Sequence, residues 1–395
     1  MRLTKRIKLL PANRKIPLAW LLLKRQPIKF ATAIVGIVFA ATLILMQLGF
    51  RAALFESSVG LIKDFNADLI LVNKLSVSST GLIGFDRYRL SQIESNSSVE
   101  KTIPVRWDYV LWKYINYSEN RLAIIMGIDP STPTLLKPEI LRQQYKLKKP
   151  YRVLYDRLSR KEFGPVVSDF TKDGSSITFL NKNRIRIDGL ITIGTSFGYD
   201  AFMLTSLSTF ENISDNKPGQ IELGFIKLKP GSNPATVAKQ INLQLDDDLV
   251  VMTRQDFETF EKEYWDTSKP IGFVFAFGAI MGLLVGFVIV YQILYSDVSA
   301  HIQEYATMLS MGFTQRSLKM IVANEALILS SIAYPLAILL STFLYGMVRQ
   351  ATSIRMFMSV DRAAGTFLLI YAMCISSALL AMLRLRDADP SDVFT

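Results

Sequence analysis

Four long uncharged segments stand out in the pattern of hydrophobic and polar positions along the 395-residue chain. They occupy residues 30–50, 270–296, 326–348 and 363–383. Each is long enough to cross a bilayer, for which an α-helix needs about 20 apolar residues. The pattern therefore predicts an integral membrane protein with four transmembrane α-helices.

The first segment also has features of a cleaved signal peptide, because a basic flank precedes an apolar run. Its run is longer than the roughly 7 to 15 residues of a signal-peptide core, and no clear A-x-A cleavage site follows it. We therefore expect this segment to remain as a membrane anchor.

A large domain of helices and strands is predicted between the first and second spans. Asn233 followed by Pro234 is typical of a helix start, and Thr253 with Asp256 resembles a capping box. Segments rich in β-branched and aromatic residues, bounded by turn formers, predict strands at 67–72, 105–109, 122–128, 185–193 and 221–228. This mixture predicts a large extracytoplasmic α+β domain inserted between helices 1 and 2.

Two helical arms are expected to join this domain to the membrane, at residues 52–63 and 254–269. The second arm carries aromatic residues at helical spacing, namely Phe257, Phe260, Tyr264 and Trp265. Packed together, the arms could carry motion between membrane and domain, although an ordinary packed stalk gives the same pattern.

The N-terminal flank sets the predicted orientation. It carries nine basic residues and no acidic ones before residue 30, which the positive-inside rule places in the cytoplasm. Residues 16–23 around Trp20 predict a short interfacial helix, or an extension of the first span. The expected organisation is a basic cytoplasmic segment with the interfacial helix at 1–29, the first span and start of the stalk at 30–52, a periplasmic domain with stalk helices at 53–269, the second span at 270–296, a cytoplasmic coupling-helix loop at 297–325, the third span at 326–348, a short periplasmic loop at 349–362, the fourth span at 363–383 and a cytoplasmic tail at 384–395.

Composition narrows the chemistry. The net charge of +11 is concentrated beside the first span, which favours contact with membrane lipids and argues against nucleic acid. The single Cys374 falls in an apolar run, so no intramolecular disulfide and no metal site with the single His301 can form. The carboxylates at Asp246 to Asp248, and Glu261 with Glu263, are interpreted as solvated faces.

No catalytic set is expected. No Walker A motif occurs, so we expect this chain to bind no cofactor and to hydrolyse no ATP. The cluster Gly194, Thr195, Ser196, Phe197 and Gly198 lacks the phosphate-binding lysine. It is interpreted as a tight turn, with a partner-contact loop as the alternative.

The second span carries a face of small residues. Gly278, Gly282 and Gly286 recur every four residues, which predicts close packing against another helix. Three polar residues in or beside the spans favour helix–helix hydrogen bonds over substrate contact: Gln47, Gln292 and Asn324.

The loop between the second and third spans predicts a short amphipathic helix. Ile302, Tyr305, Ala306 and Leu309 recur at helical spacing, and Gly312 suits a left-handed cap. Such a helix could seat in a groove of a cytoplasmic partner, or lie in the interface without any partner.

The text HIQEYATMLSMGFTQRSLKMIVANEALIL in this loop resembles the coupling segment of MacB/FtsX-like ABC permeases. A Glu–apolar pair, a Leu-x-x-x-Gly turn and a later Glu correspond to Glu304 with Tyr305, Leu309 to Phe313, and Glu325. The tail RLRDADPSDVF is similar to the tail of the same permeases.

The whole chain resembles the DevC-type permeases of cyanobacteria. Similar stretches are IPLAWLLLKRQPIKFATAIVGIVFAATLILMQLGFRAALFESSV, DRLSRKEFGP, GTSFGYD and YWDTSKPIGFVFAFGAIMGLLVGFVIVYQILYSDVSAHIQEYATMLSMG. Ser299 to His301 departs from the more charged run expected there, which weakens any claim about the charge of the loop.

The resemblance implies a non-catalytic permease subunit of an ATP-driven exporter in the bacterial inner membrane, with both termini cytoplasmic. Its implied partners are a DevA-like ABC ATPase that uses ATP and Mg, a DevB-like membrane fusion adaptor, a TolC-like outer-membrane channel and a second copy of the chain. The implied substrate is glycolipid or other envelope material. The implied ATPase-coupling residues are Ile302, Glu304, Tyr305, Ala306, Met308, Leu309, Met311 and Gly312. The alternative is an FtsX-like subunit that relays ATPase-driven movement to a periplasmic enzyme without transport.

Overall fold

The computed structural model describes residues 27–115, 119–196, 198–268, 271–352, 354 and 356–383. The chain divides into two compact units, one of residues 1–50, 274–347 and 357–395 and the other of residues 51–273 and 348–356. The predicted interfacial helix at 16–23 and the tail at 384–395 lie outside the described residues.

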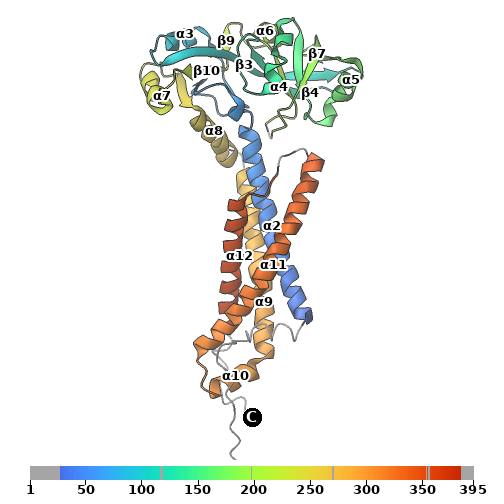
Figure 1. Ribbon diagram of the computed structural model, residues 1–395, viewed down its shortest axis with the longest axis vertical. Coiled ribbons are helices and arrows are strands. Elements are labelled where there is room, and N and C mark those ends of the chain that lie inside the picture. The colour runs from blue at the N-terminus through green and yellow to red at the C-terminus, as the bar shows by residue number, and fades with distance from the viewer. Residues whose placement is uncertain are drawn as a thin grey trace, which may run out of the picture. The chain divides into compact units, whose positions relative to one another are not determined.

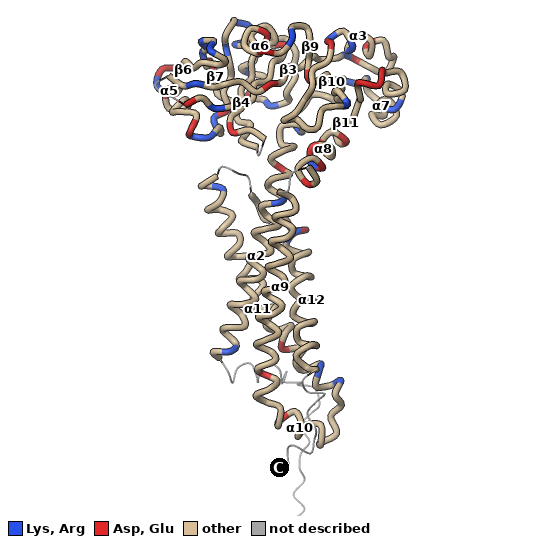
Figure 2. The backbone as a smooth tube through the Cα atoms, turned by 180° about the vertical axis from the view of Figure 1, so that it is seen from behind, with Lys and Arg blue, Asp and Glu red and all other residues tan. Residues whose placement is uncertain are grey.

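The first unit is a bundle of four long helices with one short helix at its end (Figure 1). The long helices are long and apolar enough to cross a membrane, and their middle stretches carry almost no charged residues (Figure 2). This confirms the four predicted membrane helices. Their bounds are α2 Pro27–Val59, α9 Ile271–Ala300, α11 Gln315–Thr352 and α12 Val360–Ala381, and the short helix is α10 Ile302–Ser310.

The three glycines of α9 face α2. A Cβ atom on Gly278 would lie 2.6 Å from the Gln47 amide, and one on Gly282 would lie 3.3 Å from Ile44. Gly286 meets Ala40 of α2 and Met373 of α12. The small residues therefore let α9 approach α2 within this chain, so the two helices that flank the inserted domain in sequence pack against each other.

The second unit contains a nine-stranded sheet in the order β11-β1-β10-β3-β4-β8-β5-β7-β6, with a further pairing of β3 to β6. The domain of helices and strands predicted between the first two spans is confirmed. Its strands are β1 Leu69–Asn73, β2 Phe85–Asp86, β3 Val99–Tyr114, β4 Arg121–Ile128, β5 Arg152–Asp156, β6 Ser176–Leu180, β7 Asn183–Ile191, β8 Phe202–Ser206, β9 Gln220–Ile221, β10 Leu223–Leu228 and β11 Leu249–Thr253.

One long strand, β3, belongs to two halves of this sheet. Its first part pairs with β10, and its second part pairs with β4. Because its end also pairs with β6, the strands β3, β4, β8, β5, β7 and β6 form a closed ring. The ring is filled by alternate side chains from each strand, including Trp112, Tyr155, Ile187 and Met203.

Helices cover the rest of the sheet and complete two further cores. Val237 and Ile241 of one helix pack on Leu69 and Leu71 of β1 in the first of these cores. The end of α2 and the aromatic residues Phe65 and Phe257 belong to the second. The helices are η1 Ile62–Asp64, α3 Tyr88–Glu94, α4 Pro138–Leu141, η2 Gln144–Lys148, η3 Lys161–Phe163, α5 Val166–Asp173, α6 Leu207–Ile213, α7 Pro234–Asn242, α8 Arg254–Glu263 and the π-helix η4 Tyr264–Ser268.

Both predicted helix starts are present. The Asn233 side chain accepts hydrogen bonds from the N–H groups of Ala235 and Thr236 at the start of α7. Thr253 and Asp256 form a complete capping box at the start of α8. At the edge of the sheet, Asn242 both donates to and accepts from the backbone of Val251 at 2.8 Å, which covers part of the outer edge of β11.

The two predicted arms meet beside the point where the inserted domain begins. Arg51 Nη2 of α2 donates to both carboxylate oxygens of Asp266 in η4, at 3.0 and 3.2 Å. Further along, Val59 and Phe257 belong to one buried cluster. The return arm is not a plain α-helix, because its last turn widens into the π-helix η4.

Candidate functional site

The short helix α10 is held between two long helices. His301 has φ −109° and ψ 21°, which breaks the α-helical path between α9 and α10. Its Nδ1 lies 3.0 Å from the Asp297 carbonyl oxygen, and its backbone N–H donates to the same carbonyl. α10 therefore starts at a fixed bend and not in an open loop.

The other end of α10 is closed by a Schellman motif. Gly312 has φ +93°, a left-handed conformation that favours glycine. Its N–H donates to the Leu309 carbonyl at 3.0 Å, and the Phe313 N–H donates to the Met308 carbonyl at 3.1 Å. The predicted left-handed cap is thus present, and it turns the chain directly into α11.

α10 has one buried face and one exposed face. Tyr305 and Ala306 are buried, and Ile302, Met308 and Leu309 pack against the same cluster of bundle residues. The exposed side carries Gln303, Glu304, Thr307 and Ser310. Two large apolar side chains follow at the turn, with Met311 66% exposed and Phe313 50% exposed. The exposed side of α10 therefore leads into two exposed apolar side chains.

Two polar side chains, Tyr305 of α10 and Glu325 of α11, are buried where α10 packs on the bundle and lack hydrogen-bond partners among the described residues. Both are 1% exposed, and neither the Tyr305 hydroxyl nor either carboxylate oxygen of Glu325 has a hydrogen-bond partner among the described residues. Burial raises the pKa of the Tyr305 hydroxyl, and the nearby carboxylates of Glu325 and Asp297 raise it further. A buried polar group without a partner costs about 1–3 kcal/mol, so the seat of α10 is less stable than a purely apolar one.

The eight residues assigned to ATPase coupling divide between these two faces. Glu304, Met311 and Gly312 are exposed. Ile302, Met308 and Leu309 are partly buried against the bundle. Tyr305 and Ala306 are buried against the chain's own helices, so in this structure they seat α10 and present no surface to a partner.

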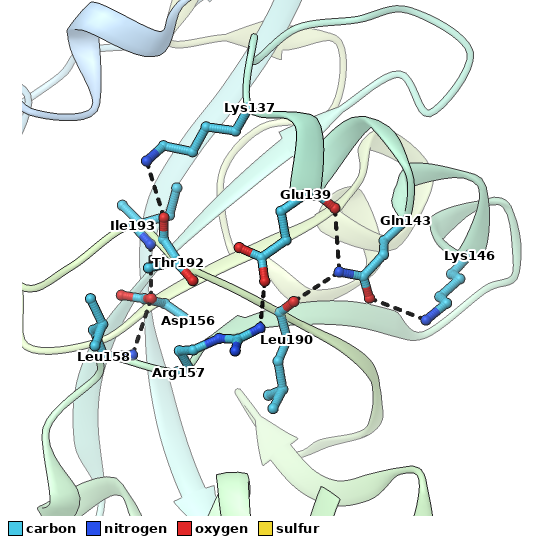
Figure 3. Close-up of polar contacts among 10 residues, drawn as sticks. All are labelled: Lys137, Glu139, Gln143, Lys146, Asp156, Arg157, Leu158, Leu190, Thr192 and Ile193. Carbon is cyan, nitrogen blue, oxygen red and sulfur yellow. Dashed lines mark hydrogen bonds and ion pairs between the residues drawn. The ribbon is translucent and has the colours of Figure 1, made fainter. Parts of the chain in front are cut away.

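The glycine-containing segment at 194–198 is pinned at its first residue. The Asp156 carboxylate accepts hydrogen bonds from the backbone N–H groups of Ile193 at 2.9 Å and Leu158 at 3.2 Å (Figure 3). It also accepts one from Gly194 at 2.9 Å, where φ is +102°. Thr195 follows directly and is half-buried, and Phe197 lies outside the described residues.

Neighbouring side chains fix the strand that leads into this turn. Lys137 Nζ donates to the Thr192 carbonyl at 3.1 Å, and Gln143 Nε2 donates to the Leu190 carbonyl at 2.8 Å (Figure 3). Within the segment, Ser196 forms an isolated β-bridge with Tyr199, and the Tyr109 hydroxyl donates to the Gly198 carbonyl at 2.5 Å. These contacts support the interpretation of the segment as a tight turn.

Glu261 corrects one interpretation of the carboxylates. A solvated face was expected, but Glu261 is 1% exposed and accepts three hydrogen bonds. The donors are Ser79 N at 2.7 Å, Ser79 Oγ at 2.9 Å and Trp265 Nε1 at 2.9 Å. Burial raises the pKa of Glu261 despite these donors. The spacing of Glu261 and Trp265, one helical turn apart, was the only sequence signal for this contact.

The bundle and the seat of α10 coincide with a known family. Residues 276–390 match the model described as FtsX-like permease C-terminal. The match includes most of α9 and all of α10, α11 and α12. The FtsX-like permease region therefore contains both the exposed edge of α10 and its buried seat, and it supports the assignment of the chain as an ABC-type permease subunit.

Solved structures provide three further likenesses, each to about half of the chain. The periplasmic region of MacB from Actinobacillus actinomycetemcomitans is 13% identical over 50% of this chain and 94% of its own, with a TM-score of 0.33. The extracellular domain of the noncanonic ABC-type transporter YknZ from Gram-positive bacteria is 9% identical over 48% and 100%, with a TM-score of 0.31. A domain of a putative permease protein from Porphyromonas gingivalis is 14% identical over 48% and 91%, with a TM-score of 0.29. No curated protein matches the sequence.

Proposed function

We propose that this chain is the membrane subunit of an ABC-type exporter of the DevC kind, and that α10 receives the movement of a separate ATPase. The observation that carries the proposal is the exposed edge of α10, which lies inside the FtsX-like permease region and ends in Met311 and Phe313. Large apolar side chains that project from a fixed turn are the kind of anchor that fills a pocket on a partner.

The seat of α10 suits a movable contact. The Tyr305 hydroxyl and the Glu325 carboxylate are buried without a hydrogen-bond partner among the described residues, so a displacement of α10 breaks no hydrogen bond of either group. The Schellman turn at Gly312 joins α10 directly to α11. In the proposed cycle, the closing ATPase pushes on α10, and α9 and α11 carry the movement along the bundle.

The wider assembly follows from the same proposal. α10 faces the cytoplasm and the inserted domain faces the periplasm, with two copies of the chain bound to two ATPase subunits. A membrane fusion adaptor and a TolC-like channel complete the path for glycolipid or other envelope material. ATP and Mg bind to the partner ATPase, and this chain carries out no catalysis.

The contact is tested by placing charges on the exposed edge. We expect the double variant Met311→Asp with Phe313→Asp to reduce co-purification of the ATPase roughly tenfold or more, because two charges would enter an apolar pocket. Since both side chains are exposed, membrane insertion and yield should not change. Leu243→Asp is the control, because Leu243 is 87% exposed in the other unit and should leave ATPase binding intact.

Unchanged ATPase binding in the double variant would remove α10 as the contact. A second measurement tests the orientation independently, with a cysteine introduced at the exposed Ser310 and a membrane-impermeant thiol reagent. The native Cys374 is buried and should react slowly. Labelling of Ser310→Cys in intact cells with a permeabilised outer membrane would place α10 outside and overturn the proposal.

A further inference from the structure

Three arginine side chains line one open cleft on the outside of the six-strand ring. β7 alternates exposed and buried residues from Arg184 to Ile187, so Arg184 and Arg186 lie on the same outward face. Arg152 on the parallel strand β5 is the direct partner of Arg186. The three arginines line a cleft of about 290 Å³ with Pro150, Tyr151, Ile177 and Ile185.

The charge in this cleft is not balanced. Asp188, on the same face of β7, contacts two of the arginines, with Oδ1 2.8 Å from Arg186 Nε and Oδ2 3.4 Å from Arg152 Nε. Arg184 forms no ion pair with any carboxylate in the described part of the chain. Three guanidinium groups therefore share one carboxylate, which leaves a net charge of about +2 in a small space.

Two further cations lie next to the cleft in the chain. Lys148 and Lys149 are exposed and come directly before Pro150, which lines the cleft. Across the described ranges of the chain, neither of them forms an ion pair. Because neighbouring positive charges repel one another, an anion that neutralises these lysines and arginines should bind and stabilise the folded domain.

We propose that the cleft between β5, β6 and β7 binds a phosphoryl group, held by the guanidinium groups of Arg152, Arg184 and Arg186. A guanidinium presents its N–H donors in a planar fork that matches two phosphate oxygens. Ile177, which is partly exposed on β6, places an apolar side chain beside the charged group, and this suits a phosphoryl group attached to a larger apolar molecule. The site lies in the inserted domain and is independent of the contact at α10.

The same chemistry could come from a free phosphate or from a phospholipid headgroup, and the experiment separates the two. The full chain is purified in a neutral detergent, and its thermal midpoint is measured at constant ionic strength with each of three probes. The probes are inorganic phosphate, dihexanoyl phosphatidic acid as a soluble lipid with a terminal phosphoryl group, and dihexanoyl phosphatidylcholine as the lipid control without one.

Variants then identify the groups that bind. We expect Arg184→Gln to abolish the upward shift of the midpoint, and Arg184→Lys to weaken binding about tenfold because it keeps the charge and loses the fork. Lys182→Gln is the matched control because it removes the same charge at a position outside the cleft. Lys182 is exposed on the turn between β6 and β7 and does not line the cleft. Arg184→Gln without any probe should be at least as stable as the natural chain, because one repulsive charge is removed.

Each outcome decides the proposal. If inorganic phosphate raises the thermal midpoint and Arg184→Gln abolishes this effect, the site accepts free phosphate. If only phosphatidic acid raises the thermal midpoint and the same variant abolishes the effect, the site binds a lipid headgroup. No shift with either probe, or the same shift in Arg184→Gln, overturns the site. Equal binding by Arg184→Lys would overturn the assignment to guanidinium groups.

Discussion

The buried carboxylate of Glu261 makes a testable contribution to the inserted domain. Glu261→Gln replaces an acceptor of three hydrogen bonds by a group with one acceptor oxygen and one NH₂ donor. Ser79 N donates to one carboxylate oxygen, whereas Ser79 Oγ and Trp265 Nε1 both donate to the other. Whichever way the amide is turned, its NH₂ group faces at least one N–H donor.

The expected cost follows from that conflict. One buried donor loses its partner, which costs about 1–3 kcal/mol. For a domain of this size the thermal midpoint shifts by about 2–4 °C per kcal/mol, so Glu261→Gln should lower it by about 2–12 °C. The assay is thermal unfolding of the full chain in detergent, followed by tryptophan fluorescence, with Glu263→Gln on the exposed side of the same helix as the control.

The pH dependence gives a second readout with a defined sign. Because burial raises the pKa of Glu261 in the folded protein, the folded state binds the proton more tightly than the unfolded state does. This contribution to stability is fully present below the unfolded pKa and is lost as pH rises through the folded pKa. The gap in stability between the natural chain and Glu261→Gln should therefore widen as pH falls into this window. A midpoint unchanged by the substitution, or parallel pH profiles, would refute the buried carboxylate.

Two predictions concern the membrane bundle. Gly278→Leu should lower the thermal midpoint of the purified chain by the equivalent of about 1–3 kcal/mol, because a Cβ at Gly278 would lie 2.6 Å from the Gln47 side chain. The control is Gly365→Leu, because a Cβ at Gly365 meets nothing within 4 Å. Equal effects of the two substitutions would contradict the packing of α9 on α2. Gly312→Ala should destabilise the turn after α10 by about 1 kcal/mol, because φ is +93° there. In the reconstituted complex, it should lower the ATPase activity more than it lowers the amount of complex formed. Unchanged ATPase activity would argue against a mechanical role for the turn.

The membrane helices could be predicted from sequence because their signal is local. About 20 uncharged residues in succession specify a span whatever surrounds them. The start of α8 was equally readable, since the capping box of Thr253 and Asp256 lies within four residues. The left-handed cap at Gly312 needs only a glycine after an amphipathic turn.

The arrangement of the strands depends on contacts that sequence does not display. β5, β6, β8 and β11 were not predicted, and each is only five residues long. β5 and β8 are buried along almost their whole length, so they lack the alternation that marks a half-exposed strand. The closing of the ring depends on the pairing of β3 with β6, whose residues are more than 60 positions apart in sequence.

The candidate site at α10 was located by sequence but its faces were not fully resolved. Helical periodicity separates apolar from polar positions, and it placed Tyr305 on the apolar side. The periodicity does not show whether an apolar face packs on the chain itself or on a partner, because either kind of contact would bury the same residues. Glu325 was noted only as a motif position, since its burial beneath α10 depends on how α11 packs.

The length of β3 constrains both halves of the inserted domain at once. Its 16 residues extend over about 50 Å, and the same continuous backbone sets the register with β10, β4 and β6. A single-residue deletion near Arg106 would turn every following side chain to the opposite face and empty the ring of Trp112 and Tyr114. Changes in chain length during evolution are therefore expected in the turns around this strand and not within it, so that neither half can be resized without the other.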